Sequence, residues 1–244
     1  MNPNELAADL GEWLSGSGPE ADIVVSSRIR LARNLAGYPF LNRASLQQKS
    51  EIEALVADRL NRVRSVPDLA YQSLVGTNPL DRKVLVERHL ISREHADAKG
   101  SRGVAIGRRE SVSIMVNEED HLRMQVIRSG LDLKEAWGVM ERLDDEVGGG
   151  LPYAFSPRFG FLTACPTNAG TGMRASVMLH LPGLVLTKQI EKIFESVSKI
   201  NLAVRGLYGE GTKASGDFYQ ISNQITLGKT EVEILENVEG VIPR

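Results

Sequence analysis

The stretch RGVAIGRRESVSIMVNEEDHLRMQVIR at residues 102–128 decides the fold class. Apolar residues recur at every second position in three runs, at 103–107, 111–116 and 121–127, and a period of two is typical of β-strands. The charged tetrapeptide RRES at 108–111 separates the first two runs as a turn. Successive strands joined by short connections predict antiparallel neighbours in one sheet.

Working outward, the same pattern predicts five more strands, at 22–33, 159–164, 174–181, 201–208 and 217–225. Helices are predicted at 4–14, 131–146, 185–199 and 229–238. Two more are predicted, one that begins at the capping box of Ser45 and Gln48 and one that runs from Asn78–Pro79 through about Leu90. Strands and helices do not alternate strictly. The sequence therefore predicts an α+β fold with a mostly antiparallel sheet flanked by α-helices, rather than a doubly wound parallel sheet.

The composition fits one large globular domain. Of 244 residues, 42% are hydrophobic and 25% are charged, which supplies a sizeable core and excludes disordered or collagen-like proteins. Uncharged apolar runs such as SIMV are far shorter than the ~20 residues that span a bilayer. The N-terminus has no basic start followed by an apolar block. We expect a single domain over 1–244 and a cytoplasmic protein without membrane contact.

Charge and cysteine content exclude further classes of function. The single cysteine, Cys165, cannot form an internal disulfide, in agreement with a reducing compartment. A net charge of −2 with 5% aromatic residues argues against non-specific nucleic-acid binding. No histidine is spaced for a structural zinc site, so no protein-held metal is expected. The 29 basic residues comprise 20 Arg and 9 Lys, which indicates either phosphate binding or codon bias.

Strand parity places several arginines on a common face. Residues of equal parity in a strand face the same side, so Arg28 and Arg30 project together about 7 Å apart. The same test on 174–181 leaves Arg174 on the face opposite the core positions. Arginines on one face could bind a polyanion, although solvated surface salt bridges would give the same pattern.

Applied to 117–126, the parity argument selects a carboxylate. Core positions at 122, 124 and 126 leave Glu119, His121 and Arg123 on the functional side and turn Glu118 the other way. A carboxylate beside arginines could bind a polyanion and a cation side by side.

Glycine-rich loops and the cysteine leave alternatives open. Residues 170–175 and 209–214 match G-x-G-x-x-A, and 206–213 resembles a P-loop with its final Lys and Thr exchanged. None is followed by the helix that a dinucleotide or P-loop site requires, so these loops are expected at most to lie beside ligand phosphates. Cys165 is either a buried small hydrophobe or a reactive thiolate near arginines.

Four motifs occur in a fixed order: VVSSRIRLARN at 24–34, NEEDHLR at 117–123, CPTNAGTGMRASV at 165–177 and VRGLYGEGT at 204–212. Together they resemble the phosphagen (ATP:guanidino) kinases and, within them, the bacterial protein-arginine kinases. The resemblance covers nearly the whole chain. It implies a glutamine-synthetase-like catalytic domain with an antiparallel sheet flanked by helices.

The resemblance also implies roles for individual residues. Glu119 matches the carboxylate that holds and deprotonates the guanidinium, Glu210 matches a second such carboxylate, and Cys165 matches the active-site cysteine. His89 matches a residue beside the adenine. The implied ATP-binding set is Ser27, Arg28, Arg30, His89, Arg123, Arg174 and Arg205, with the arginines on the phosphates. ATP and Mg²⁺ are the implied cofactors.

The implied activity is in-line transfer of the γ-phosphoryl group of ATP to arginine side chains in proteins, a reaction that depends on alignment and charge neutralisation. Proteins with exposed or unfolded arginine, an activator protein and a protease–chaperone system of protein quality control are the implied partners. Three alternatives stay open: a small-molecule guanidino (arginine) kinase, a non-catalytic nucleotide- or phosphoarginine-binding module, and an enzyme that modifies guanidines through a covalent cysteine.

Both ends of the chain carry an expectation. The motif SSRIRLARN begins at Ser26, after one short helix, so we expect no helical N-terminal lid domain of the kind found in small-molecule kinases. The last helix pattern runs into the C-terminus, so we expect a chain cut short at Arg244, without the C-terminal segment linked to dimerisation.

Overall fold

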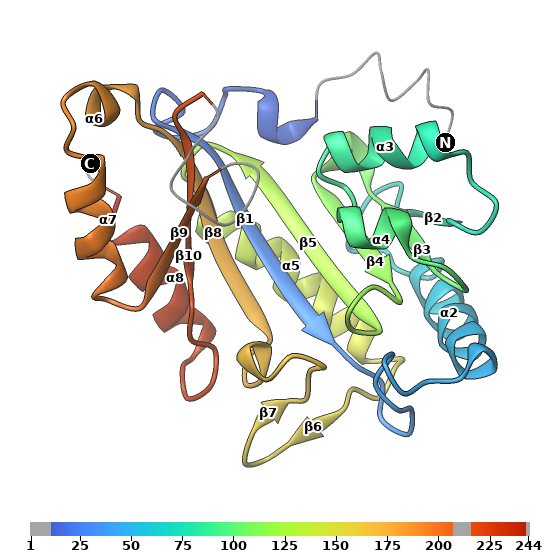
Figure 1. Cartoon of the computed structure of the whole chain (residues 1–244). Coiled ribbons are helices and arrows are strands. Elements are labelled where there is room, and N and C mark those ends of the chain that lie inside the picture. Colours follow the sequence, from blue (N-terminus) through green and yellow to red (C-terminus); the bar gives the residue numbers. More distant parts are fainter. Residues whose placement is uncertain (1–10, 207–215, 243–244) are drawn as a thin grey trace.

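A computed structural model describes residues 11–206 and 216–242, and an eight-stranded antiparallel sheet forms its frame (Figure 1). The strand order across the sheet is β2-β3-β4-β5-β1-β8-β10-β9. The strands are β1 (Val24–Arg33), β2 (Ala70–Ser73), β3 (Gly103–Ile106), β4 (Val112–Val116), β5 (Leu122–Ser129), β8 (Met173–His180), β9 (Leu202–Gly206) and β10 (Phe218–Asn223). A separate hairpin pairs β6 (Phe155–Ser156) with β7 (Gly160–Phe161). The predicted fold class is confirmed.

Most of the helices lie in the connections between the strands. They are α2 (Leu46–Leu60), α3 (Pro79–Glu87), α4 (Arg93–Asp97), α5 (Leu133–Gly148), α6 (Pro182–Leu186), α7 (Ile190–Ser198) and α8 (Glu231–Glu239), with 3₁₀ turns η1 (Glu12–Leu14), η2 (Arg108–Glu110) and η3 (Pro166–Asn168). The Ser45–Gln48 capping box is formed as predicted, and Ser45 Oγ accepts a hydrogen bond from the Gln48 backbone N–H.

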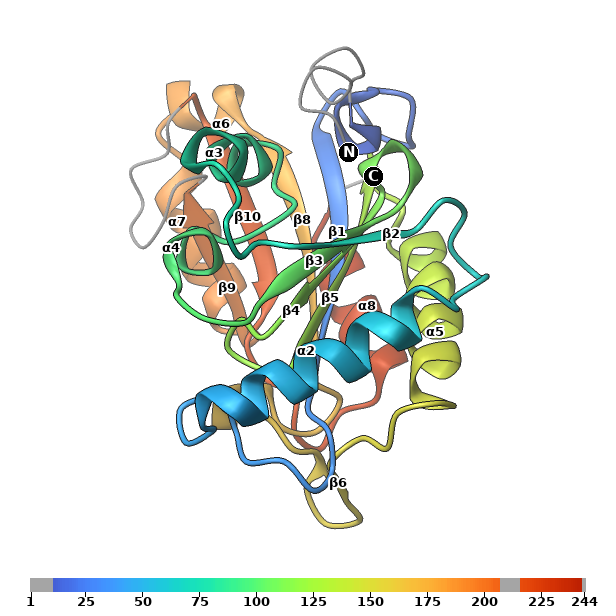
Figure 2. The same cartoon turned by 90° about the vertical axis from the view of Figure 1, so that its right-hand side faces the viewer.

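Most of the hydrophobic core lies on one face of the sheet. Apolar side chains of α2, α5 and α8 form one buried cluster there with odd-numbered residues of β1, such as Ile29 and Leu31, which are fully buried. A smaller core under α3 and α4 includes Leu85, Leu90 and Val104. Figure 2 shows α5 and α8 on one side of the sheet and α3 and α4 on the other. The even-numbered residues of β1 therefore face a side that helices cover only in part.

Some expected elements differ in extent. The helix expected at 185–199 is two helices, α6 and α7, separated at Lys188, whose φ of 56° ends the first one. The strand expected at 159–164 is paired only over Gly160–Phe161, and it belongs to the separate hairpin. Of the helix expected at 4–14, the described part forms η1, and residues 1–10 lie outside the described ranges.

The elements β2 and α4 were not expected from the sequence, because each has only four or five residues and carries too little periodicity to be recognised. Within the described ranges, no helix is long and apolar enough to cross a membrane.

Candidate active site

Arginines occupy the open face of the central strands. Arg30 on β1 lies directly opposite Arg174 on β8, and Ala32 lies opposite Arg123 on β5. Cross-strand partners point to the same face of a sheet, so Arg28, Arg30, Arg123 and Arg174 share the face that the core does not use. The parity predicted for β1 and β8 is confirmed.

These arginines carry positive charge that the protein does not fully compensate. Burial, and then the nearby Arg123, lowers the pKa of Arg28 to about 10. Burial lowers the pKa of Arg30 well below its ordinary value, and the neighbouring arginines add to this shift. Among the residues that the structure describes, the buried Nε of Arg30 has no hydrogen-bond partner. An anion nearby would stabilise this cluster of buried, like-charged groups, so the site is suited to bind one.

Glu118 partly neutralises this cluster. Both of its carboxylate oxygens accept hydrogen bonds from Nη1 of Arg123, at 2.9 and 2.8 Å, and Ser92 Oγ donates to it at 2.6 Å. Burial alone would raise the pKa of Glu118, but the charge of Arg123 and the hydrogen bonds from Ser92, Arg123 and the Glu119 N–H together outweigh burial, so the pKa is lowered. The expectation that Glu118 points away from Arg123 is wrong, because residues 117–121 form a turn between β4 and β5.

His121 also departs from the parity argument. Its ring is fully buried, and Nδ1 accepts a hydrogen bond from the Leu35 N–H at 2.9 Å. Nε2 lies 3.0 Å from the carbonyl oxygen of Pro39. The ring therefore holds the loop after β1, and it does not face a ligand.

Glu119 projects from the same turn into a pocket of about 200 Å³. The pocket is lined by Arg30, Leu31, Ala32, Glu119, Arg123, Cys165, Thr167, Asn168, Gly172 and Arg174. Partial burial, and then the charge of Asp120, raises the pKa of Glu119. One carboxylate, one thiol and three guanidinium groups therefore meet in a small volume.

Cys165 and Arg174 complete this pocket. Cys165 is half-buried, and its Sγ lies 3.0 Å from Thr167 Oγ1. Burial, and then the charge of Arg205, lowers the pKa of Arg174, whereas Cys165 and Glu119 act to raise it. The thiol therefore lies within electrostatic range of the arginines.

Asp120 holds the Glu119 turn against the segment that leads to Cys165. Its buried carboxylate accepts hydrogen bonds from Asn34 Nδ2 at 2.5 Å and from the Ala164 N–H at 2.7 Å. Asp120 is not among the residues predicted from the sequence. Its only signal was a third acidic residue in the run at 118–120, which does not distinguish a buried carboxylate from an exposed one.

A larger cleft of about 660 Å³ adjoins this pocket. Arg28, Arg30, Arg123 and Gln125 line its floor, and Trp13, His89, Met178 and Phe218 are among its walls. The rings of Trp13 and His89 meet edge to face at 5.0 Å. Burial, and then Arg28, lowers the pKa of His89, so its imidazole is neutral at pH 7. Trp13 was expected to pack on the apolar side of a helix, and it instead forms a wall of the cleft.

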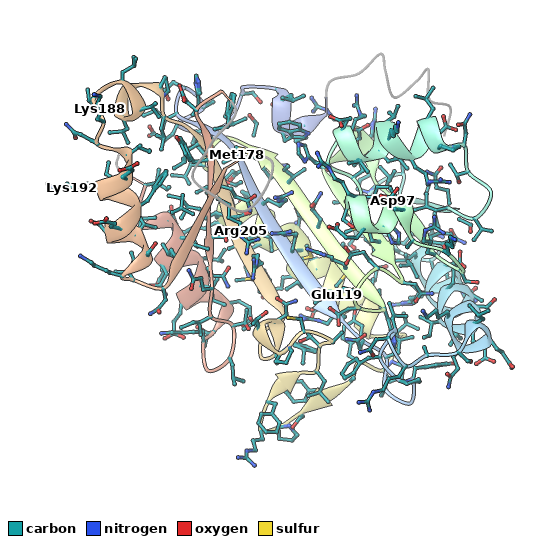
Figure 3. The ribbon with its side chains drawn as sticks, viewed as in Figure 1. Asp97, Glu119, Met178, Lys188, Lys192 and Arg205 are labelled. Atoms are coloured by element: carbon teal, nitrogen blue, oxygen red, sulfur yellow. The ribbon has the colours of Figure 1, made fainter. Side chains whose placement is uncertain are left out.

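Arg30 and Arg123 line both cavities, so the two form one continuous site. In Figure 3, Glu119 and Arg205 lie on opposite sides of β1. Arg205 is exposed on β9, opposite Gln220 of β10, and Gln220 Oε1 accepts a hydrogen bond from Arg28 Nη2 at 3.0 Å. Gln220 is not predicted from the sequence, because an amide on a strand carries no distinctive signal.

Of the remaining expected residues, one lies on the other face of the sheet and one falls outside the described ranges. Ser27 is fully buried on the opposite face, where its Oγ donates to the Gly130 carbonyl at 2.7 Å and accepts from the Asp132 N–H at 2.9 Å. Its odd parity directs the Ser27 side chain towards the start of α5, so Oγ does not face the arginines, and ATP binding by Ser27 stays a prediction. Glu210 lies outside the described residues.

A basic cleft joined to a pocket that holds a carboxylate and a thiol defines, on this antiparallel sheet, a phosphotransferase site. The profile of the family described as ATP:guanido phosphotransferase, C-terminal catalytic domain, matches residues 51–244. The chain belongs to this family and is a kinase domain.

Within this family, the chain is similar to proteins named protein-arginine kinase. Protein-arginine kinase from Symbiobacterium thermophilum is 50% identical over 248 residues, covering 99% of this chain and 69% of the relative. Protein-arginine kinase from Halothermothrix orenii is 50% identical over 233 residues, covering 96% of this chain and 66% of the relative. The chain thus spans about two thirds of the length of these relatives.

Solved structures share the fold. The duplicated taurocyamine kinase from Schistosoma mansoni with bound transition state analog components matches with a TM-score of 0.83 and 28% identity, covering 95% of this chain and 33% of that one. A lombricine kinase structure matches with a TM-score of 0.81 and 27% identity, covering 93% of this chain and 66% of that one.

Proposed function

We propose that this chain is the catalytic domain of a protein-arginine kinase, which transfers the γ-phosphoryl group of ATP to a guanidinium nitrogen of arginine side chains in proteins. One observation carries the proposal. Glu119 and Cys165 share a small pocket with Arg30, Arg123 and Arg174, and two of these arginines continue into the larger cleft.

ATP fits the larger cleft. The unpartnered Nε of Arg30 and the lowered pKa values of Arg28 and Arg30 show positive charge that a triphosphate would neutralise. The adenine would lie against Trp13 and the neutral ring of His89, at the end of the cleft away from Glu119. The γ-phosphate would then lie at Arg30 and Arg123, where cleft and pocket meet.

The acceptor needs a base. A guanidinium group has a pKa far above neutral and therefore no free lone pair at neutral pH. Glu119 would bind it, orient one nitrogen towards the γ-phosphate and accept a proton as the N–P bond forms. The raised pKa of Glu119 makes it a better base than an ordinary carboxylate. Glu210 is proposed as the second carboxylate, and a thiolate at Cys165 would add negative charge beside the guanidinium.

Mg²⁺ is proposed to enter with the nucleotide. Among the described residues, no group of three carboxylate, histidine or cysteine side chains could hold a metal ion. Mg²⁺ commonly binds phosphate oxygens and keeps several waters, so the nucleotide itself would supply its ligands. When bound, the ion neutralises charge on the phosphates.

The similarity pattern supports a protein acceptor. Relatives named protein-arginine kinase are about 50% identical, whereas the solved taurocyamine and lombricine kinases are 27–28% identical. An activator protein, a protease–chaperone partner and a cytoplasmic location belong to the same proposal. We propose one catalytic domain over 1–244, because β1 precedes the matched range and yet is a central strand of the sheet.

The proposal is tested by incubating the chain with ATP, Mg²⁺ and either an unfolded arginine-rich protein or free arginine. We expect phosphate on the protein that is labile in acid and stable in base, because an N–P bond forms. Phosphorylation of free arginine alone would identify a small-molecule kinase. Nucleotide binding without transfer to either acceptor would identify a non-catalytic module.

A further inference from the structure

The hairpin of β6 and β7 exposes two large apolar side chains. Phe155 is 58% exposed and Phe159 is 44% exposed. In Figure 1 the hairpin projects beyond the end of the main sheet, next to the loop that carries η3. Two half-exposed phenylalanines on one short hairpin indicate a contact surface.

The base of the hairpin is firmly anchored. The ring of Phe161 packs against Phe155 at 5.3 Å and against Tyr153 at 6.0 Å between centroids, and the guanidinium carbon of Arg33 lies 3.5 Å from its centre. Arg33 is itself buried and paired with Asp144. The exposed rings are therefore presented from a fixed support, which lowers the entropy lost when a partner binds.

The hairpin is also bonded to a wall of the Glu119 pocket. The Phe161 N–H donates to the Gly170 carbonyl at 2.8 Å, and the Gly170 N–H donates back at 3.3 Å. Residues 165–172 form the loop that carries Cys165 and Gly172, both of which line the pocket. The base of the hairpin is thus joined directly to the loop that forms one wall of the pocket where the arginine side chain would bind.

We propose that Phe155 and Phe159 form a docking surface for the polypeptide that flanks the target arginine, and that they bind apolar side chains of unfolded protein substrates. The inference rests on the proposed function. A polypeptide whose guanidinium enters the pocket must carry its backbone across the pocket mouth, beside this hairpin. Folded proteins bury most of their large apolar side chains, so the surface favours unfolded chains.

The test compares binding of two fluorescent peptides by anisotropy and their phosphorylation by kcat/KM. Both peptides have one central arginine, flanked in one by leucine and valine and in the other by serine and glycine. In the Phe155→Ser/Phe159→Ser double variant we expect a loss of about tenfold in affinity and kcat/KM for the apolar peptide. The polar peptide should change less than about twofold.

The matched control is a Leu186→Ser/Ile200→Ser variant, because these side chains are 82% and 52% exposed on α6 and after α7, away from the pocket. It should leave both peptides unchanged. If the double variant fails to fold, Phe159→Ser alone gives the same comparison. Within the described ranges the Phe159 ring has no aromatic partner, and it lies 4.9 Å from the guanidinium carbon of its neighbour Arg158.

Three outcomes would overturn the inference: equal losses for both peptides, unchanged binding of the apolar peptide, or a changed sedimentation coefficient of the variant, which would indicate contact between copies of the chain. Wild-type protein that binds the apolar peptide without transferring phosphate would refute the proposed function, while the binding comparison would still decide the docking surface.

Discussion

Glu119 is the residue on which the proposed chemistry depends most. Glu119→Gln keeps the size of the side chain and its polar contacts but removes the base, so kcat should fall by roughly 10²–10⁴. ATP affinity should change by only a few-fold, because Glu119 lines the small pocket and not the larger cleft. Rapid-quench turnover and equilibrium nucleotide titration measure the two effects. Loss of ATP binding instead would place Glu119 with the nucleotide.

The pH dependence of turnover should show the same group. Burial raises the pKa of Glu119 above that of an ordinary glutamate. A base must be deprotonated, so kcat should decline as pH falls through this raised value, and the decline should begin at a higher pH than for an unperturbed glutamate. Cys165→Ser should retain this acidic limb. A rate that does not change across the acidic range would contradict the role of Glu119 as base.

At the scale of elements, one buried ion pair joins the central strand to the helix layer. Arg33 at the end of β1 is 1% exposed and donates from Nη2 to Asp144 of α5 at 2.7 Å. Asp144→Ala leaves the buried guanidinium unpaired, so the free energy of unfolding should fall by about 3–5 kcal/mol. Arg33 also donates to the Thr171 carbonyl, so the same change should loosen the loop beside Cys165.

Urea unfolding measures this loss, and the exposed pair of Asp58 with Arg62 supplies the control. Asp58→Ala should lower the free energy of unfolding by at most about 1 kcal/mol, because exposed ion pairs contribute little. Equal effects of the two substitutions would show that the Arg33 pair is no stronger than a surface contact.

The elements also show why the sequence predicted part of the site and missed the rest. Arg28 and Arg30 were placed correctly because Ile29 and Leu31 supply a clear period of two within a long, regular strand. Glu118 was misplaced because side chains alternate between the two faces only within a strand. In the five residues of the turn at 117–121, hydrogen bonds determine the side-chain directions. The period of two in a strand therefore cannot predict which carboxylate of the adjoining turn pairs with which arginine.

At the scale of the whole molecule, the arginine cluster lowers the stability of the ligand-free fold and favours the binding of an anionic ligand. Four guanidinium groups share one face of the central strands, and burial together with mutual repulsion lowers the pKa of Arg28, Arg30 and Arg174. The sheet could hold apolar side chains at these positions at lower free energy. A nucleotide that neutralises the cluster should therefore stabilise the fold, by about 2.7 kcal/mol at a concentration of 100 Kd.

Arg30→Met tests this balance, because Arg30 lines both cavities and its Nε has no partner. Without nucleotide, the free energy of unfolding of the variant should equal that of the wild type or exceed it by up to about 2 kcal/mol. The rise in melting temperature produced by ADP and Mg²⁺ in the wild type should be largely lost. Arg62→Met, at an exposed position, should alter neither quantity. A nucleotide-free variant that is clearly less stable than the wild type would mean that the free protein already compensates the charge of Arg30, and that the cluster is structural.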